Sequence, residues 1–233
     1  EEYWMNLLAD RMEPYLHASG VNTVRNDPAA GAAGAIRLSN QGDYDFHLAL
    51  HSNASPEALA GQQRGVDFYY YPASTAGLRM ANILVDNIKP IYPLPEKVRA
   101  LSTVAIGDVR RTRAPAVLAE LGYHDNLEAE AWITGNIEPI AAALVESVCE
   151  YFGLPFLQPM VRQEGTVVLT SGALNLRAAP SYDAPVYLQI PNGETVTVWG
   201  EYDNWYVVEY DGTFGYVRGE YLRLNGESVI QPR

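Results

Sequence analysis

Two short segments hold the residue types that can carry out hydrolytic chemistry. In "AELGYHDN", residues 119–126, Glu120 ends the apolar run "APAVLAE" and His124 follows four residues later. In "DFHLALHSNA", residues 45–54, two histidines stand on one alternating segment. Zinc bound by protein ligands keeps a position open for water, and a glutamate outside its coordination shell can accept the water's proton. These residues therefore indicate metal-assisted hydrolysis.

His51 is the better of the two metal ligands that the segment 45–54 offers. Along a strand, His47 and His51 share a face about 13 Å apart, too far for both to bind one ion at about 2.0–2.1 Å. His51 stands at the carboxyl end of the strand, where open α/β sheets place their sites. We expect His47 to be a core histidine, His17 to be solvated, and Asn53 to orient substrate or hold the loop.

The elements that position these residues alternate between helix and strand. In three segments apolar residues recur at helical spacing, and three other segments are short runs rich in residues that favour strands. Strands separated by helices predict an α/β fold whose strands are joined by crossover connections. We expect helices at 3–20, 74–88 and 136–153, and strands at 43–51, 65–72 and 114–120.

The pattern changes after residue 157, which we take as the end of the first domain, 1–157. Residues 158–164 contain proline and end before a run of short strands, so they predict a linker. Closely spaced turn residues such as "PNGE" and "YDGT" punctuate these strands over residues 165–225, which is typical of a small all-β barrel. Residues 226–233 are expected to form a disordered tail.

Four motifs occur in a specific order over about residues 1 to 153. They are "HLALHSNA", "GVDFYYYP", "RAPAVLAELGYHDN" and a closing helix that ends in "YFG". In combination they resemble the zinc-dependent N-acetylmuramoyl-L-alanine amidases, the amidase-3 family of bacterial wall remodelling and phage lysis. The resemblance implies a mixed sheet flanked by helices. It also implies that His51 binds zinc and that Glu120 is the catalytic acid/base.

A glutamate that opens the first long helix is a further zinc ligand in that family. The segment "EEYWMNLLADRM" resembles this helix, and the apolar positions Ala9 and Met12 favour Glu1 as the ligand, with Glu2 as the alternative. The family pattern begins with a strand that ends in another zinc histidine, whereas this sequence starts at the first long helix. We expect upstream residues to supply that strand, because loss of a central strand would expose two unpaired edges.

His124 departs from the family pattern, which has an apolar residue at this position. Gly122 lets the chain bend so that His124 can face the same pocket as Glu120. We predict that His124 supplies a zinc nitrogen, in place of the family's first histidine, or supports a ligand from outside the coordination shell. The alternative is that His124 caps a helix begun by Asp125 and Asn126.

The second domain is similar to bacterial SH3-like domains along its whole length, through "LNLRAAPS", "GETVTV", "NWYVV" and "GTFGYVRGEYL". Such modules usually bind cell-wall peptide or glycan. Aromatic rings with polar edges suit a sugar or a peptide, although a small barrel also needs large side chains for its core. The aromatic residues in question are Trp205, Tyr206, Tyr210, Tyr216 and Tyr221. A structural spacer is the alternative role.

These resemblances imply a peptidoglycan hydrolase that cleaves the amide between N-acetylmuramic acid and L-alanine. Its cofactor would be Zn²⁺ and its partner the bacterial cell wall, which implies an extracellular or wall-associated location. The alternative is a non-catalytic wall-binding protein with a degenerate amidase fold. Zinc content and cleavage of muramoyl-alanine would distinguish the two.

The composition of this 233-residue sequence excludes some classes of binding partner. A formal net charge of −12 with no basic cluster argues against binding to nucleic acid. No apolar run approaches the roughly 20 residues that a membrane span needs, and no secretory signal is visible. The single cysteine, Cys149, lies on the apolar face of a helical segment, so we expect a buried thiol and no disulfide. The sequence carries no prediction of oligomeric state.

Overall fold

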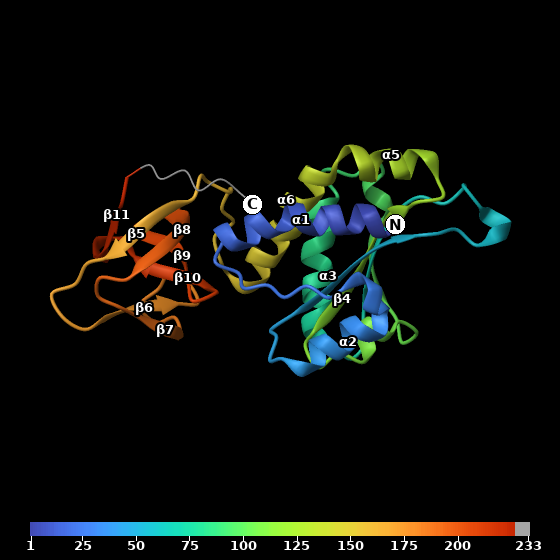
Figure 1. Cartoon of the computed structure of the whole chain (residues 1–233). Helices are drawn as coiled ribbons and strands as arrows, with labels where there is room; N and C mark the ends of the chain where they lie inside the picture. The colour runs from blue at the N-terminus through green and yellow to red at the C-terminus, as the bar shows by residue number, and fades with distance from the viewer. Residues whose placement is uncertain (227–233) are drawn as a thin grey trace. The chain divides into compact units, whose positions relative to one another are not determined.

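The computed structural model describes residues 1–226, which form two compact units (Figure 1). The first unit combines residues 1–12 with residues 25–151, and the second combines residues 13–24 with those from 152 onward. Each unit is an independent cluster of packed elements and is described separately. Within the described residues, no helix is long and apolar enough to cross a membrane.

The first unit is an α/β structure built on a mixed four-stranded sheet. The strand order is β1-β4-β2-β3, with β1 parallel to β4, β2 antiparallel to β4, and β3 parallel to β2. The strands are β1 (His47–Asn53), β2 (Val66–Tyr70), β3 (Val98–Ser102) and β4 (Ala116–Tyr123). The helices are α1 (Glu2–Ala18), whose last turns belong to the second unit, α2 (Gly31–Gln41), α3 (Thr75–Ile88), α4 (Gly107–Arg110), α5 (Leu127–Gly135) and α6 (Ile137–Phe152). The predicted mixed sheet with flanking helices is confirmed.

Local signals in the sequence explain where two of these helices begin and end. Ser74 is the N-cap of α3, and its hydroxyl accepts a hydrogen bond from the backbone N–H of Gly77 at 2.9 Å. Gly153 follows α6 with φ +68°, a left-handed conformation that glycine adopts without a steric penalty. Both boundaries agree with those expected from the sequence.

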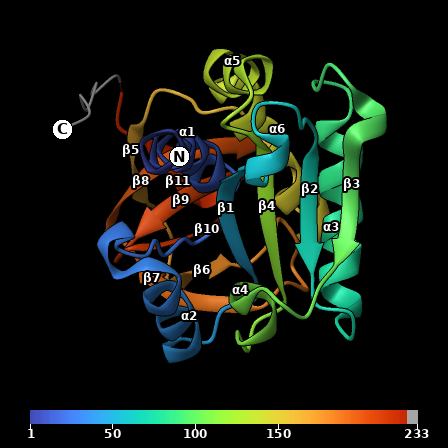
Figure 2. The ribbon, with the colours of Figure 1, turned by 90° about the vertical axis from the view of Figure 1, so that its right-hand side faces the viewer.

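The two faces of the sheet have different coverings. On one face, Phe68 and Val117 are fully buried together with the apolar side of α3. On the other, α4 packs through Val109 against Leu118, near the end of the sheet where β4 begins. Figure 2 shows α2 and α4 near that end of the sheet and α5 beyond the opposite end. Because side chains alternate along a strand, Glu120 lies on the same face as Leu118 but beyond the cover of α4.

The second unit is an all-β domain with one added segment of chain. Its strand order is β11-β5-β8-β9-β10-β6-β7. These strands are β5 (Gln163–Val167), β6 (Ala173–Arg177), β7 (Val186–Pro191), β8 (Thr195–Tyr202), β9 (Trp205–Tyr210), β10 (Thr213–Arg218) and β11 (Leu222–Leu224). The predicted tail lies outside the described residues apart from Gly226.

Residues 13–24 pack against the strands of this unit. The hydroxyl of Tyr216, which is fully buried, donates to the backbone carbonyl of Ser19 at 2.7 Å. A Cβ atom on Gly200 would lie 2.4 Å from the carbonyl oxygen of Ala18, so only glycine permits this approach. Tyr216 and the buried Trp205, which belong to one core cluster, are therefore core residues. Tyr216 thus has the core role that the sequence left open as the alternative, whereas Trp205, although buried, also lines a groove.

His17 is also part of this packing, so the expectation of a solvated histidine is wrong. Its ring stacks on Phe214 with centroids 3.9 Å apart and meets Trp199 edge to face at 5.1 Å. Burial lowers the pKa of His17 from 6.5 to about 4, against the opposing effect of the Glu209 carboxylate. The folded protein therefore holds this imidazole in its neutral form.

The low pKa of His17 predicts a pH dependence of stability. Between pH 6.5 and about pH 4 the unfolded chain binds a proton that the folded chain does not, so stability falls as pH decreases through this window. We expect His17→Phe, which keeps an aromatic ring on Phe214, to lose less stability over that range than the parent chain. Thermal unfolding of both proteins at matched pH values measures the difference. Parallel curves would contradict this assignment.

Candidate active site

The carboxyl ends of β1 and β4 bring His51 and Glu120 side by side. The two strands run parallel, and His51 is the register partner of Glu120. Register partners project from the same face of a sheet. Both residues thus stand on the face and at the end of the sheet that α4 leaves open.

Glu1 joins this pair from the start of α1. Its Oε1 atom lies 3.0 Å from Nδ1 of His51 and accepts a hydrogen bond from the backbone N–H of Ser52 at 3.3 Å. Glu2, the alternative ligand, is an exposed residue in the first turn of α1. The structure thus brings the carboxylate of Glu1 to His51 and leaves Glu2 on the surface of the helix.

His124 is held close to the same strand end by Ser52. Its Nδ1 atom lies 3.0 Å from the carbonyl oxygen of Ser52 and 3.1 Å from the Ser52 hydroxyl. A proton on Nδ1 satisfies the carbonyl and leaves Nε2 with its lone pair, the form that binds metals. Gly122, two residues before His124, has φ +87°, the backbone bend that the sequence predicts.

The alternative role for His124 as a helix cap is wrong. Asn126 is the N-cap of α5, and its side chain accepts hydrogen bonds from the backbone N–H groups of Glu128 and Ala129. The backbone N–H of His124 donates to the carbonyl of Asn53 at 2.9 Å, and its ring contacts Ser52 rather than the start of α5. The Asn53 side chain accepts from the N–H of Ala54, so its observed contacts hold the loop.

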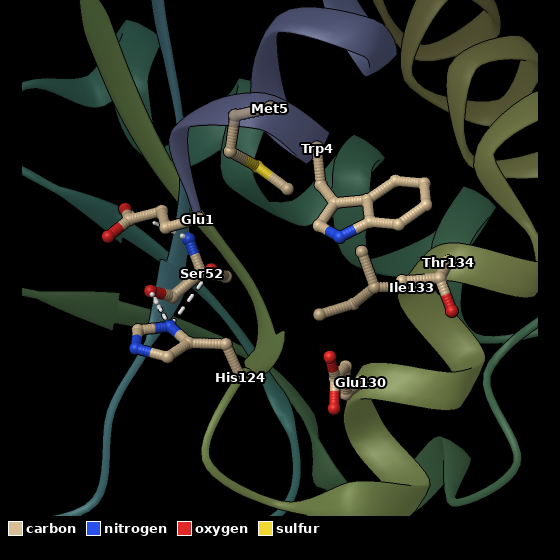
Figure 3. A pocket seen from close by; sticks show the side chains of 8 residues that line it. All are labelled: Glu1, Trp4, Met5, Ser52, His124, Glu130, Ile133 and Thr134. Atoms are coloured by element: carbon tan, nitrogen blue, oxygen red, sulfur yellow. Dashed lines mark hydrogen bonds between the residues drawn. The ribbon is translucent and has the colours of Figure 1, made fainter.

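Glu1 and His124 line one side of a pocket of about 160 Å³ (Figure 3). The indole of Trp4 and the side chain of Ile133 lie on the other side, with Glu130 next to Ile133. The pocket therefore combines polar and apolar groups, as ligand sites commonly do.

Glu120 has the properties of a general base. Its Oε2 atom is buried and has no hydrogen-bond partner among residues 1–226. Burial raises the pKa of Glu120, and the negative charges of Glu1 and Asp67 add to the effect, while His51 and His124 oppose it. A carboxylate with a raised pKa accepts protons more readily near neutral pH. The unpartnered oxygen is available for a water or a substrate group.

Two residues of this site were not found from the sequence. Asp67 is the register partner of Glu120 on β2, and it is 2% exposed. Arg99 on β3 donates to both Asp67 oxygens, from Nε at 2.8 Å and from Nη2 at 3.0 Å. A single acid within the apolar run "GVDFYYYP" is the signal that could have identified Asp67, since a buried carboxylate requires a partner.

The fit of a zinc ion can be judged from the donor atoms. Glu1 and His51 meet at 3.0 Å and provide one oxygen and one nitrogen, the donor types that zinc prefers. His124 lies at the same strand end, with Nδ1 held by Ser52. As the side chains are placed in the described residues, no three His, Cys, Asp or Glu groups converge closely enough to hold a metal. Glu1 and His51 would therefore supply two donors to an ion, and a third does not meet them among the described residues.

Comparison with known protein families identifies the family to which the chain belongs. A model of the N-acetylmuramoyl-L-alanine amidase family matches residues 1–150, and a model of the bacterial SH3 domain matches residues 172–223. The chain belongs to the N-acetylmuramoyl-L-alanine amidase family. It is a peptidoglycan hydrolase that cleaves the amide between N-acetylmuramic acid and L-alanine. Among curated proteins, none matches the chain significantly.

Solved amidase structures share the fold of this enzyme. The catalytic domain of the CD27L endolysin targeting Clostridia difficile is 24% identical, with a TM-score of 0.54 over 64% of this chain and 83% of that one. The amidase AmiC2 of Nostoc punctiforme is 18% identical, with a TM-score of 0.56 over 66% and 84%. The catalytic domain of CwlV from Bacillus (Paenibacillus) polymyxa is 21% identical, with a TM-score of 0.56 over 65% and 84%. At these identities the likeness establishes the fold alone.

Proposed function

We propose that the amide is cleaved with the help of a zinc ion held by Glu1, His51 and Nε2 of His124. When bound, zinc would supply the positive charge that polarises the scissile carbonyl and lowers the pKa of water. The support for this proposal is the pair of donors that already meet, together with the Nδ1 contact that fixes the tautomer of His124.

In this proposal Glu120 transfers the proton. The carboxylate accepts a proton from the attacking water, whose oxygen adds to the lactyl carbonyl carbon of N-acetylmuramic acid. Glu120 then donates that proton to the nitrogen of L-alanine, which leaves as an amine. The single observation that carries this role is the buried Oε2 atom of Glu120, the register partner of His51, which has no hydrogen-bond partner in the described part of the chain.

The products of digestion test the proposed function. The chain, supplied with zinc, is incubated with purified walls, and the soluble products are identified by mass spectrometry. We expect stem peptides with a new L-alanine amino terminus and glycan strands that keep their lactyl groups. Peptides cleaved elsewhere in the stem would show peptidase specificity, and intact walls would favour the non-catalytic wall-binding alternative.

We also propose that the barrel tethers the enzyme to the wall through a groove of about 570 Å³. Its lining includes Tyr182, Trp205 and two arginines, Arg177 and Arg218. The rings of Tyr182 and Trp205 lie 5.4 Å apart, and the Arg218 guanidinium lies 5.4 Å from each ring. Such a wall of rings and cations suits sugar or peptide ligands. Because the wall lies outside the cell, this role implies export of the enzyme.

Tyr182→Ala tests the groove without disturbing the barrel core. The Tyr182 side chain is 61% exposed, so its removal should change stability little. We expect weaker sedimentation with insoluble walls and an unchanged rate on soluble muropeptides, since tethering raises local concentration only on an insoluble substrate. Tyr202→Ala, at another exposed tyrosine outside the groove, is the matched control. Equal sedimentation of the two variants would exclude the groove as the anchor.

A further inference from the structure

A row of charged side chains crosses the sheet beside the proposed catalytic group. His51 on β1 pairs with Glu120 on β4, Glu120 pairs with Asp67 on β2, and Asp67 pairs with Arg99 on β3. Register partners share a face, so the four side chains project to the same side. Arg99 therefore ends a row that begins at the proposed metal ligand.

The Arg99 guanidinium is held in place by Asp67, and only some of its N–H groups donate hydrogen bonds. Its Nε and Nη2 atoms donate to the two oxygens of Asp67, a bidentate pair that holds the plane of the guanidinium. The remaining N–H groups, on Nη1 and the outer side of Nη2, have no partner among residues 1–226. The Arg99 side chain is 53% exposed, although Asp67 beneath it is buried. The free edge of the guanidinium can accept a second carboxylate from solvent.

The negative charge around Arg99 suggests what its free N–H groups bind. Glu1, Glu120 and Asp67 place three carboxylates along or beside the row, and the whole chain carries −12. Beside the charge that zinc would supply at Glu1 and His51, a fixed cation farther along the row favours an anionic group of the substrate at that position. Arg99 is the only lysine or arginine on the row, and Asp67 keeps its side chain from turning away.

We propose that Arg99 determines substrate specificity by binding a free carboxylate of the stem peptide. The inference rests on the proposed function, because it assumes that the scissile amide lies between His51 and Glu120. It assigns a preference for stem peptides whose residues beyond L-alanine carry an unmodified carboxylate. The two N–H groups of the free edge would each donate to one carboxylate oxygen, the geometry for which arginine is suited.

The spacing of the strands fits this assignment. Neighbouring strands lie about 4.8 Å apart, so the backbone of Arg99 is about 10 Å from that of Glu120. An extended peptide advances about 3.3–3.6 Å per residue. A carboxylate on the second or third residue of the stem therefore reaches Arg99 when the amide before the first residue is at Glu120.

The test measures binding of synthetic muramoyl tripeptides that differ in one carboxylate. The peptides carry free carboxylates, an amide at the second residue only, or an amide at the third residue only. Calorimetry on a Glu120→Gln background keeps them intact. We expect about 10- to 100-fold weaker binding when the contacted carboxylate is amidated, the effect of a lost charge-assisted pair. The peptide that loses affinity identifies which carboxylate is bound.

Variants of Arg99 separate binding from folding. Arg99→Gln leaves a buried carboxylate unpaired, so Arg99→Lys, which keeps the charge but not the fork, and the double change Asp67→Asn with Arg99→Gln are made in parallel. We expect each folded variant to bind the free and amidated peptides with more nearly equal affinity. Arg25→Gln is the matched control, since Arg25 is another arginine of the same unit whose partners include a carboxylate, that of Asp10.

Two outcomes overturn the proposal. One is that the background chain binds all peptides equally or binds none of them. The other is that the Arg99 variants keep the full preference for the free carboxylate. Failure of the proposed function gives a different result, because the parent chain would then leave the amide intact although the preference in binding and its dependence on Arg99 remained.

Discussion

Glu120→Gln is expected to lower the turnover of muropeptides by about 10²- to 10⁴-fold, the usual contribution of a general acid–base group. Glutamine has nearly the same shape but cannot accept the water's proton. Because Oε2 of Glu120 has no partner in the described residues, the amide breaks no observed hydrogen bond of that oxygen. The measurement is the initial rate of release of L-alanine amino termini, with zinc content determined on the same samples.

The control for this variant is Glu130→Gln, which changes an acid that lines the pocket but lies on α5, away from the strand row. We expect that variant to keep its rate within a few fold. A Glu120→Gln enzyme that works at nearly the parent rate would remove Glu120 from the mechanism. Loss of zinc together with activity would instead make Glu120 a ligand.

His124→Ala is the change with the next largest expected effect. If Nε2 of His124 is a zinc ligand, the variant loses zinc and activity together, because the ion then keeps Glu1 and His51 but loses one of the donors proposed among the described residues. Zinc affinity by competition with a chelator and the rate at saturating zinc are the two measurements. The loss of the Ser52 hydrogen bonds should cost only about 1 kcal/mol of stability.

His17→Phe provides the matched control, since it removes a histidine of the second unit and should leave zinc affinity unchanged. A His124→Ala variant whose affinity falls by about 10–100-fold and whose activity returns with excess zinc would place the residue outside the coordination shell. Unchanged affinity would contradict any role of His124 toward the metal.

The site residues that the sequence predicted best are those at strand ends, which the local pattern of apolar residues identifies. Alternation along residues 43–51 and the apolar run that ends at Glu120 identify strand ends, and strand ends meet at one edge of a sheet. The helix α2 (Gly31–Gln41) was missed because "GAAGAIRLSNQ" has few large apolar residues to mark a period. The strand β3 (Val98–Ser102) was missed because "VRALS" lacks the aromatic residues that marked β2, which is equally short.

Contacts between residues far apart in the sequence could not be predicted from the sequence. The pairing of Asp67 with Arg99 depends on the register of β2 and β3, which no short pattern encodes. The burial of His17 depends on residues 13–24 packing against Phe214, almost two hundred residues later. The approach of Glu1 to His51 followed only from the family resemblance, since nothing in the composition of "EEYW" marks a ligand. Local propensity decides elements, whereas packing decides their partners.

The most direct test of the central claim follows the oxygen atom of the attacking water. The chain, loaded with zinc, digests a muropeptide in water enriched in ¹⁸O, and mass spectrometry locates the label. We predict one ¹⁸O atom in the lactyl carboxylate of N-acetylmuramic acid and none in the released peptide, because Glu120 directs water to the lactyl carbonyl. Label in a carboxyl group of the stem peptide, or an unlabelled and uncleaved substrate, would contradict the account.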